Sequence, residues 1–543
     1  MLGTGNNARG SSLALLVALL VALVPASCGD GGRERPNVLW ISIDTLRADH
    51  LGCYGYPRPT SPNLDRLARE GVLFERAVAP TSWTLPSHVS MLTGLDISAH
   101  GACDERLWAR KDVHGRHVKP PLRGRSIAES LRDAGYATAG FYTFSYLSPT
   151  FGFGAGFDTW ERLGHNLFSQ DETRVEFQAL RAANDVPAIQ AFLDEHADLL
   201  DARRRSTPEI VERANRWVTE HAEQRGDDPF FLFLHLFDVH DPYTPTEAFD
   251  RFGDPDYAGT VDGRITGEHY PLRAGVPPRA DREELVALYD GGIAFVDDQL
   301  ERVFARLREL ELEDDTLVVL TSDHGEEFFE HADAGHRRQL YIESLHVPLI
   351  LRWPGRLPAG RRVSGTVGLA DIAPTILAAT GARRAHAMTG TDLLPFARGE
   401  QTNSGRMYVG MLHLFERGSD GIERAIERQV SLFRGDEHIL VTYCPNQAFR
   451  AERYDLSRDP RELGPPTVFH EHDRAGIELA KQFDSIRLGR AALRARLPRS
   501  EANLEAMTAR QRSALASSGY VSSEALETSS SERLCMDGCV FWR

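Results

Sequence analysis

Short runs of apolar residues alternate along the chain with longer segments whose apolar residues recur at helical spacing. The clearest apolar runs are Asn37–Ile43, Thr138–Tyr142, Phe230–Leu236 and Thr316–Leu320. Runs of this length with few polar interruptions are typical of strands buried on both faces. The segments with helical spacing are Pro62–Arg69, Ile127–Ala134, Thr207–Glu223 and Arg282–Leu310. The alternation predicts an α/β protein with a mostly parallel sheet.

A hydroxyl residue stands at the start of a short helical stretch. Thr84 lies two places before Pro86, and proline suits the first turn of a helix because its missing N–H has no partner there. A Pro86–Met91 helix would hold the Thr84 hydroxyl at its N-terminus, where free N–H groups favour an anion or an alkoxide. The stretch resembles the sulfatase signature Cys/Ser-x-Pro-Ser-Arg-x-x-x-Leu-Thr-Gly, with Thr84 in the nucleophile position and His88 in the arginine position.

The departures from this signature change the expected chemistry. Sulfatases oxidise their Cys or Ser to formylglycine, and threonine cannot yield that aldehyde. No formylglycine is therefore expected, and the Thr84 hydroxyl itself is the expected nucleophile. The stretch Thr45–Gly55 also resembles the family, but Thr45 stands where many sulfatases have a second aspartate. That loss lowers the ligand charge and disfavours calcium, which prefers many hard oxygens.

The resemblance extends over much of the chain, roughly from Pro36 to Glu462. The Tyr341–Ile350 block, with its Val-Pro-Leu-Ile strand, resembles the family, and so does the Asp459-Pro460-Arg461-Glu462 turn. It implies the alkaline phosphatase and sulfatase fold: a mostly parallel sheet flanked by helices on both faces, followed by a smaller C-terminal α/β subdomain.

Four residues from distant parts of the chain form the expected metal site. Asp44 follows the first apolar run, and Asp323 and His324 follow Thr316–Leu320. Ligands of open α/β sheets bind outside the carboxyl ends of the strands, so these side chains are well placed to meet the Thr84 oxygen. Mixed oxygen and nitrogen ligands favour zinc or manganese, with calcium left open.

Candidates for proton transfer and anion binding lie in two loops. His240, ahead of Asp-Pro-Tyr, resembles the family's His-x-Pro loop, where the histidine faces the ester oxygen. A histidine of near-neutral pKa can protonate a leaving alkoxide. Arg337 stands where the family commonly has a lysine that contacts the anionic group, and His336 precedes it. Asp238 and His235 are weaker candidates for orienting His240 or reaching a second metal.

These residues predict a metal-dependent hydrolase of sulfuric or of phosphoric and phosphonic esters. The overall pattern favours sulfate esters, whereas the threonine favours phosphorus, because a threonyl sulfate lacks the easy release of a formylglycine hydrate. Two alternatives remain open: a transferase that passes the group to an acceptor in the cell envelope, and a binding protein that has lost turnover. The substrate is in each case an anionic ester.

The N-terminus has the pattern of a signal for export. Arg9 precedes the apolar run Leu13–Val24, which is short for a membrane span, and small residues then lead to Cys28. That cysteine resembles the lipidated residue of a bacterial lipoprotein, which would attach the protein to a membrane. The expected location is the periplasm or the cell envelope. Cys535 and Cys539 are candidates for a disulfide there.

Composition and length complete the expectations. The formal net charge of -16 argues against nucleic acid and against an anionic membrane surface as partners. The 543 residues exceed one small core. We expect a leader over residues 1–28, a catalytic domain over 36–395, a C-terminal subdomain over 396–470, and a helical, partly mobile tail over 471–543.

Overall fold

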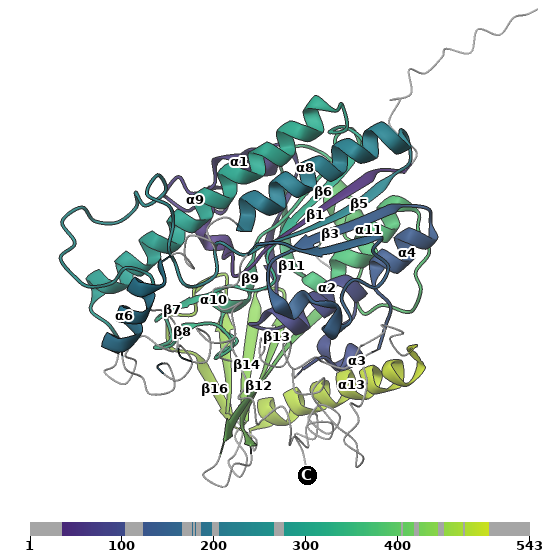
Figure 1. Ribbon diagram of the computed structural model, residues 1–543. Helices are drawn as coiled ribbons and strands as arrows, with labels where there is room; N and C mark the ends of the chain where they lie inside the picture. Colours follow the sequence, from purple (N-terminus) through teal and green to yellow (C-terminus); the bar gives the residue numbers. More distant parts are fainter. Residues whose placement is uncertain are drawn as a thin grey trace, which may run out of the picture.

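The computed structural model describes most of the chain between Arg35 and Pro498 (Figure 1). The described ranges are 35–103, 123–164, 186–197, 206–264, 276–402, 405–417, 423–443, 450–470 and 473–498, together with Glu176 and Leu180. The predicted leader, the expected lipidation site Cys28, and Cys535 and Cys539 lie outside these residues. Within the described part, no helix combines the length and the apolar character needed to cross a bilayer.

A nine-stranded sheet forms the centre of the molecule, with the path β11-β2-β10-β6-β1-β5-β3-β4 and β9 beside β2. The three central strands, β6, β1 and β5, are parallel, and their registers join Ser42 to both Thr321 and His235. Only the pairings of β10 and β9 are antiparallel. The strands are β1 Asn37–Ile43, β2 Val72–Val78, β3 Ala137–Tyr142, β4 Thr159–Arg162, β5 Phe230–Leu236, β6 Thr316–Thr321, β9 His346–Val347, β10 Leu349–Arg352 and β11 Arg361–Gly368.

Helices cover both faces of this sheet (Figure 1). The helices α1 Pro62–Glu70, α8 Ser206–Arg225 and α9 Arg279–Glu309 bury one apolar cluster against the sheet. A second cluster on the other face includes side chains of α2 Thr84–Thr93, α4 Ile127–Asp133 and α11 Ile372–Thr380. The smaller helices are α3 Ile97–His100, α6 Val186–Glu195, α10 Ile342–Leu345 and α12 Leu394–Arg398. The predicted α/β class and its mostly parallel sheet are confirmed.

A second, five-stranded sheet follows in the chain and packs below the first (Figure 1). Its strands, all antiparallel, are β12 Met407–Arg417, β13 Glu423–Arg434, β14 Glu437–Tyr443, β15 Arg450–Asp455 and β16 Thr467–His470. The helix α13 Arg474–Arg496 contributes Leu479 to the small apolar cluster on this sheet. The predicted C-terminal α/β subdomain is therefore present.

Two predicted element boundaries differ from the structure. The helix expected over Pro86–Met91 is α2, which starts at Thr84, so that Thr84 occupies the first turn instead of preceding it. The helix expected over Arg282–Leu310 is α9, which starts earlier, at Arg279. In the first case proline at the third position is still compatible with the first turn, whose N–H groups have no partners within the helix.

Candidate active site

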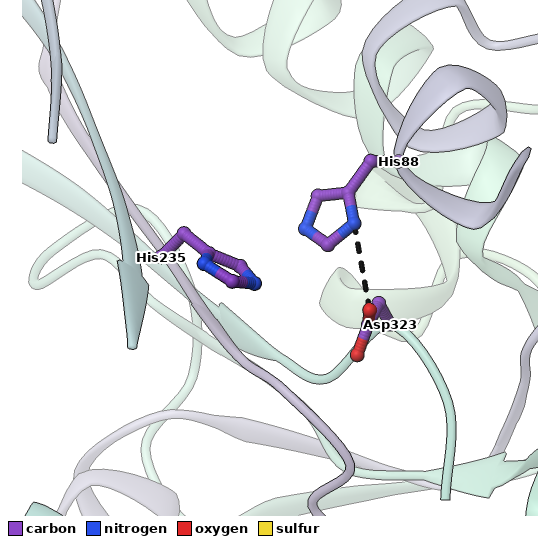
Figure 2. Close-up of side chains that lie close together, drawn as sticks. All are labelled: His88, His235 and Asp323. Carbon is purple, nitrogen blue, oxygen red and sulfur yellow. Dashed lines mark ion pairs between the residues drawn. The ribbon is translucent and has the colours of Figure 1, made fainter. Parts of the chain in front are cut away.

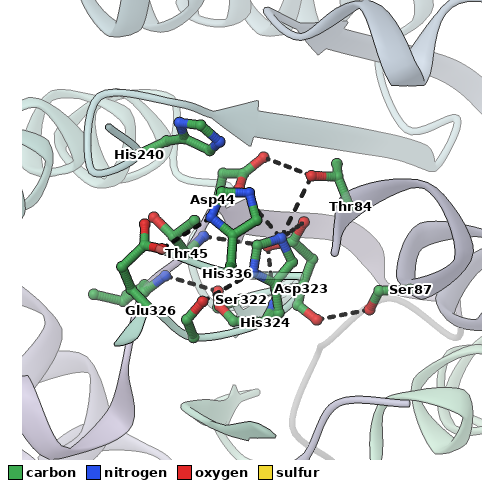
Figure 3. A network of polar contacts seen from close by, with 12 residues as sticks. Asp44, Thr45, Thr84, Ser87, His240, Ser322, Asp323, His324, Glu326 and His336 are labelled. Carbon is green, nitrogen blue, oxygen red and sulfur yellow. Dashed lines mark hydrogen bonds and ion pairs between the residues drawn. The ribbon is translucent and has the colours of Figure 1, made fainter. Parts of the chain in front are cut away.

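The expected metal ligands meet because of the sheet's parallel register. β1 and β6 are hydrogen-bonded neighbours, with Ser42 opposite Thr321, so the residues that follow them emerge at the same edge. Asp44 leaves β1 there, and Asp323 and His324 leave β6. Figure 3 shows these three side chains together with Thr84, which reaches the same place from the first turn of α2.

The four ligand atoms have the spacing that a metal ion requires. His324 Nε2 lies 3.7 Å from Asp44 Oδ1 and 3.5 Å from Asp323 Oδ2. Thr84 Oγ1 lies 3.4 Å from His324 Nε2 and 3.5 Å from Asp44 Oδ2. Metal–ligand bonds of about 2.0–2.2 Å in a tetrahedral arrangement separate neighbouring ligand atoms by about 3.5 Å. The spacing therefore fits a divalent ion of the zinc type.

Two buried carboxylate oxygens point to the same conclusion. Asp44 Oδ1 and Asp323 Oδ2 have no hydrogen-bond partner among the described residues, although both side chains are fully buried. Burial and the charge of Asp44 raise the pKa of Asp323. The pKa of Asp44 is lowered in spite of its burial, chiefly by its hydrogen bond to His235. A divalent cation would satisfy both orphaned oxygens and offset the repulsion between the two carboxylates, so the residues present fit a metal.

Neighbouring groups orient the ligands. His324 Nδ1 lies 2.9 Å from the Gly325 carbonyl oxygen, which can only accept, so the proton resides on Nδ1 and Nε2 keeps its lone pair for a metal. Burial lowers the pKa of His324, which favours this neutral form. Asp323 Oδ1 accepts hydrogen bonds from the backbone N–H of His324 at 3.0 Å and from that of Thr45 at 3.3 Å.

Thr45 contributes its backbone to the site. Its φ of 60° is in the left-handed region, and this conformation accompanies the hydrogen bond from Thr45 N to Asp323. The Thr45 hydroxyl is buried and has no hydrogen-bond partner among the described residues. It is therefore a neutral oxygen at the position where the resemblance implied a missing carboxylate.

Behind the ligands lie two buried histidines (Figure 2). His235 Nε2 donates to Asp44 Oδ2 at 3.1 Å, which leaves Oδ1 facing the ligand set. His88 donates from Nδ1 to the Thr84 carbonyl at 2.9 Å, and its Nε2 lies 3.2 Å from Ser42 Oγ. Burial and the nearby His235 lower the pKa of His88 to about 3, so it is neutral.

His88 and His235 also form a group with Asp323 whose spacing would suit a metal. Because both His88 nitrogens already have hydrogen-bond partners, this group supports the first site better than it would hold a second ion. The structure thus places the predicted catalytic residue His88 behind Thr84, where it stabilises the first turn of α2.

His240 lies across the site from the ligands, in the loop after β5 (Figure 3). Its Nδ1 lies 2.9 Å from Asp241 Oδ1 and 2.8 Å from the Asp241 carbonyl, so Nδ1 carries a proton. Burial alone would lower the pKa of His240, but the Asp241 carboxylate outweighs it and raises that pKa to about 9. His240 is therefore a cation at neutral pH and a suitable proton donor.

His336 stands between His240 and the ligands. Its ring centroid lies 4.8 Å from that of His240 and 4.7 Å from that of His324. Its Nδ1 lies 2.9 Å from Glu326 Oε1, and Glu326 is fully buried. The other expected anion-binding residue, Arg337, places its guanidinium 4.3 Å from the ring centre of Trp83, and its backbone N–H donates to Ser82 O at 2.8 Å.

Sequence reasoning missed some of the residues around the site and misjudged others. Glu326 was not a candidate, although an acidic residue two places after His324 is a usable signal. His235, a weaker candidate for orienting His240 or reaching a second metal, instead bonds to the candidate ligand Asp44. Asp238 was expected to orient His240; its carboxylate instead accepts from the N–H and hydroxyl of Thr207 at the start of α8.

Comparison with known proteins agrees with this architecture. The family model described as Sulfatase matches residues 36–382, and that described as N-sulphoglucosamine sulphohydrolase, C-terminal, matches residues 330–487. The fold and the family match place the molecule among the alkaline phosphatase superfamily of ester hydrolases. Within that class, the chain belongs to the sulfatase family.

Some similar proteins are named as sulfatases, and others as a phosphonate monoester hydrolase or as an alkaline phosphatase superfamily protein. The multifunctional alkaline phosphatase superfamily protein PehA of Trinickia caryophylli is 29% identical over 409 residues, 67% of this chain and 77% of its own. N-acetylglucosamine-6-O-sulfatase of Bacteroides thetaiotaomicron is 24% identical, over 83% of this chain and 87% of its own. The phosphonate monoester hydrolase of Agrobacterium radiobacter has the same fold, with a TM-score of 0.58 and 23% identity over 85% of this chain and 96% of its own.

Proposed function

We propose that this chain is an exported, metal-dependent hydrolase of sulfuric or of phosphoric and phosphonic esters, in which Thr84 is the nucleophile. One observation carries the proposal: the Thr84 hydroxyl lies 3.4–3.5 Å from His324 and Asp44, next to two buried carboxylate oxygens that have no hydrogen-bond partner in the described part of the chain. A hydroxyl in that position is at once a metal ligand and the start of a helix. Both surroundings favour its deprotonated form.

The expected ion is zinc or manganese, held by Asp44, Asp323, His324 and the Thr84 oxygen. When bound, it supplies a Lewis acid that lowers the pKa of the Thr84 hydroxyl and neutralises developing charge. The protein's own part is positional. His235 orients Asp44, and the His88 ring stabilises the turn that presents Thr84.

The reaction has two steps in this proposal. Thr84 Oγ1 attacks sulfur or phosphorus in line; the new Oγ1 bond forms as the ester bond breaks, and His240 gives its proton to the leaving oxygen. Water then attacks the Thr84 ester and gives a proton to the now neutral His240. The bond to Oγ1 breaks, which releases the acid and restores both the deprotonated Thr84 oxygen and the cationic His240. The cationic His240, with His336 and Arg337, would neutralise the equatorial oxygens of the group in transfer.

The names of similar proteins favour anionic esters but disagree about the central atom. PehA is named for multiple activities in the alkaline phosphatase superfamily, and others are named for sulfated sugars or for phosphonate monoesters. The nucleophile favours phosphorus, because a threonyl sulfate has no carbonyl-assisted route of release. We therefore rank phosphoric and phosphonic esters slightly ahead of sulfates.

Export follows from the leader pattern, with Cys28 as the lipid attachment point that would tether the protein to the cell envelope. Cys103 is disulfide-bonded in the structure, which suits an oxidising compartment. If Cys28 carries the anchor, Cys28→Ser should move the protein from the membrane fraction to the soluble fraction. Retention of the Cys28→Ser protein in the membrane fraction would contradict it.

The proposed function is tested with the domain that follows Cys28, loaded with zinc, manganese or calcium. Hydrolysis of an aryl phosphodiester, an aryl phosphonate monoester and an aryl sulfate is measured beside Thr84→Ala. Thr93→Ala is the matched control, because Thr93 lies at the other end of the same helix and its hydroxyl donates to Val89 O. Turnover that Thr84→Ala abolishes and Thr93→Ala preserves is expected; turnover that survives Thr84→Ala would refute the nucleophile.

A further inference from the structure

The segment that carries His336 has an unusually strained backbone. Phe329, Ala332 and Arg337 have φ values of 68°, 65° and 65°, which L-residues rarely adopt. They are three of the six described non-glycine residues with positive φ, and a fourth is Glu462. Such conformations persist only where the surrounding structure over-determines them. The segment Phe329–Arg337 must therefore be held by contacts from elsewhere.

Those contacts come from the C-terminal sheet. Leu340 N donates to Gln429 Oε1 of β13 at 2.9 Å, and Tyr341 Oη donates to Glu452 Oε2 of β15 at 3.0 Å. The Tyr341 ring stacks on the His331 ring, with centroids 3.6 Å apart. The residues that directly follow the strained segment are thus fixed to residues more than eighty positions later in the chain, and His331 within the segment packs on one of them, Tyr341.

Glu462 joins these contacts through its side chain and its backbone. Its Oε2 accepts from Ile342 N at 2.9 Å, at the start of α10, and its carbonyl oxygen lies 3.0 Å from His331 Nε2. Its Oε1 bonds to His438 Nδ1, and His438 Nε2 lies 2.7 Å from Ser431 Oγ. Glu462 is 1% exposed, and it closes the Asp459–Glu462 turn for which the proposed reaction has no use.

The helix that Glu462 holds packs directly behind a metal ligand. Gly325 N donates to Ser344 O at 2.8 Å, between His324 and Glu326. A Cβ at Gly325 would lie only 1.9 Å from the Glu343 carbonyl oxygen, so no side chain fits between α10 and the strand end. Glu326 in turn bonds to His336. A continuous set of contacts therefore runs from Glu462 to the side of the site that faces the substrate.

We propose that Glu462 is a positioning residue of the active site: it clamps α10 and the strained segment Phe329–Arg337, and so sets His336 beside His240 and His324. The C-terminal sheet thereby completes a site whose proposed metal ligands lie just after strands of the first sheet and in the first turn of α2. This inference rests on the proposed function for the role of His336, but its structural part does not depend on turnover.

The test compares Glu462→Ala with Glu462→Gln and with Val441→Ala, a core truncation of the C-terminal sheet that does not touch the segment. Glu462→Gln keeps both side-chain contacts. The amide oxygen can accept from Ile342 N, and the amide N–H can donate to His438 Nδ1 when the His438 proton is on Nε2, which then donates to Ser431. We expect Glu462→Ala to lower kcat/KM at least tenfold with unchanged metal affinity, and the other two variants to lower it less than threefold. A loss no larger for Glu462→Ala than for Val441→Ala would overturn the proposal.

A double-mutant cycle asks whether Glu462 acts through His336. We expect Glu462→Ala to cause less than a threefold further loss of kcat/KM in a His336→Ala background. Losses that multiply independently would contradict a positioning role. If Glu462→Ala does not fold, His331→Phe serves instead: it keeps the stacking on Tyr341, removes the bonds to Glu462 O and to Glu343 Oε1 of α10, and is expected to cost at least threefold in kcat/KM.

Hydrogen exchange separates this inference from the proposed function. In Glu462→Ala or His331→Phe, amides of residues 329–343 should exchange at least tenfold faster, while those of β1 and β6 keep their protection. Unchanged exchange in 329–343 would overturn the clamp even in an active enzyme. Faster exchange in a protein whose Thr84→Ala variant retains turnover would uphold the clamp and refute only the nucleophile.

Discussion

The two sides of the candidate active site, the proposed metal ligands and the proposed substrate-binding residues, are built in different ways. The metal side, Asp44, Asp323 and His324, leaves adjacent parallel strands, and its positions follow from the register of β1 and β6. The substrate side, His240, His336 and Arg337, lies in loops, and one of those loops adopts strained φ values under contacts from a second sheet. The sheet itself therefore fixes the metal side, whereas the substrate side depends on contacts from residues distant in the chain.

The largest expected effect comes from removing a ligand on the metal side. Loss of a residue that orients a metal ligand typically costs about 10–100-fold in metal affinity. Asp323→Asn changes a proposed ligand itself, so it should weaken the affinity by more than that, and activity should be lost in parallel. Competition with a chelating dye measures the affinity. Asp436→Asn is the matched control, because Asp436 is an exposed carboxylate that pairs with Arg76. Equal affinities in both variants would exclude Asp323 as a ligand.

Removing the proposed acid breaks the substrate side alone. His240→Asn should reduce kcat for esters with poor leaving groups by about 10²–10⁴, the usual range for general acid catalysis, and leave metal affinity unchanged. Esters of nitrophenol, whose leaving group needs no proton, should lose far less. A loss that does not depend on the leaving group would assign His240 to anion binding instead.

The same residue predicts the alkaline limb of the pH profile. The pKa of His240 is raised to about 9, so the acid form persists at neutral pH and is lost as the pH rises through that value. A bound cation adds positive charge and moves the limb downward. Asp241→Asn removes the group that raises the pKa and should shift the limb to lower pH. A limb that stays in place in both Asp241→Asn and His240→Asn would arise from another group.

A smaller effect is expected behind the metal side. His235→Leu should cost about 10–100-fold in metal affinity, because Asp44 loses the donor that orients it. His235→Gln offers an N–H near the same place and should restore most of the affinity. His221→Leu controls for the loss of a buried histidine, since His221 contacts Asp228 O far from the ligands. Equal affinity in the Leu and Gln variants would refute the orienting bond.

The smallest effect is expected at Arg337. Its guanidinium stacks on Trp83, a contact worth about 0.5–1 kcal/mol at exposed sites. Arg337→Met should lower kcat/KM by less than about tenfold, or 1.4 kcal/mol. His336→Ala should cost more because His336 lies against both His240 and His324. The reverse order would make Arg337 the principal anion-binding residue.

The sequence was most informative where chemistry follows a strand directly. The apolar run Asn37–Ile43 became β1 with the predicted bounds, and Asp44 emerges from it beside Asp323. The position of Thr84 was also predictable, because Pro86 marked the first turn of α2. In both cases a local pattern determines the position, since parallel strands end at a common edge and proline restricts where a helix begins.

The sequence was least informative where a position depends on long-range contacts. No local pattern indicates that His235 points to Asp44, because a histidine within an apolar strand has the same signal whichever neighbour it contacts. The sequence placed Glu462 in a turn, but no local pattern indicated that its side chain is buried and bonds to Ile342 N, 120 positions away. The strain at Ala332 and Arg337 was equally invisible, because neither residue type favours positive φ.

The central claim is that Thr84 forms a covalent ester with the group in transfer. The most direct measurement is rapid quench of the metal-loaded enzyme with an aryl phosphonate monoester, followed by mass spectrometry of the peptide that contains Thr84. We expect a burst of phenol and a mass increase of one phosphonyl group on Thr84, both absent in Thr84→Ala. The account is contradicted if the unsubstituted enzyme turns over fully with no modified peptide and the Thr84→Ala variant keeps its rate. That pair of results would show that water attacks the ester directly.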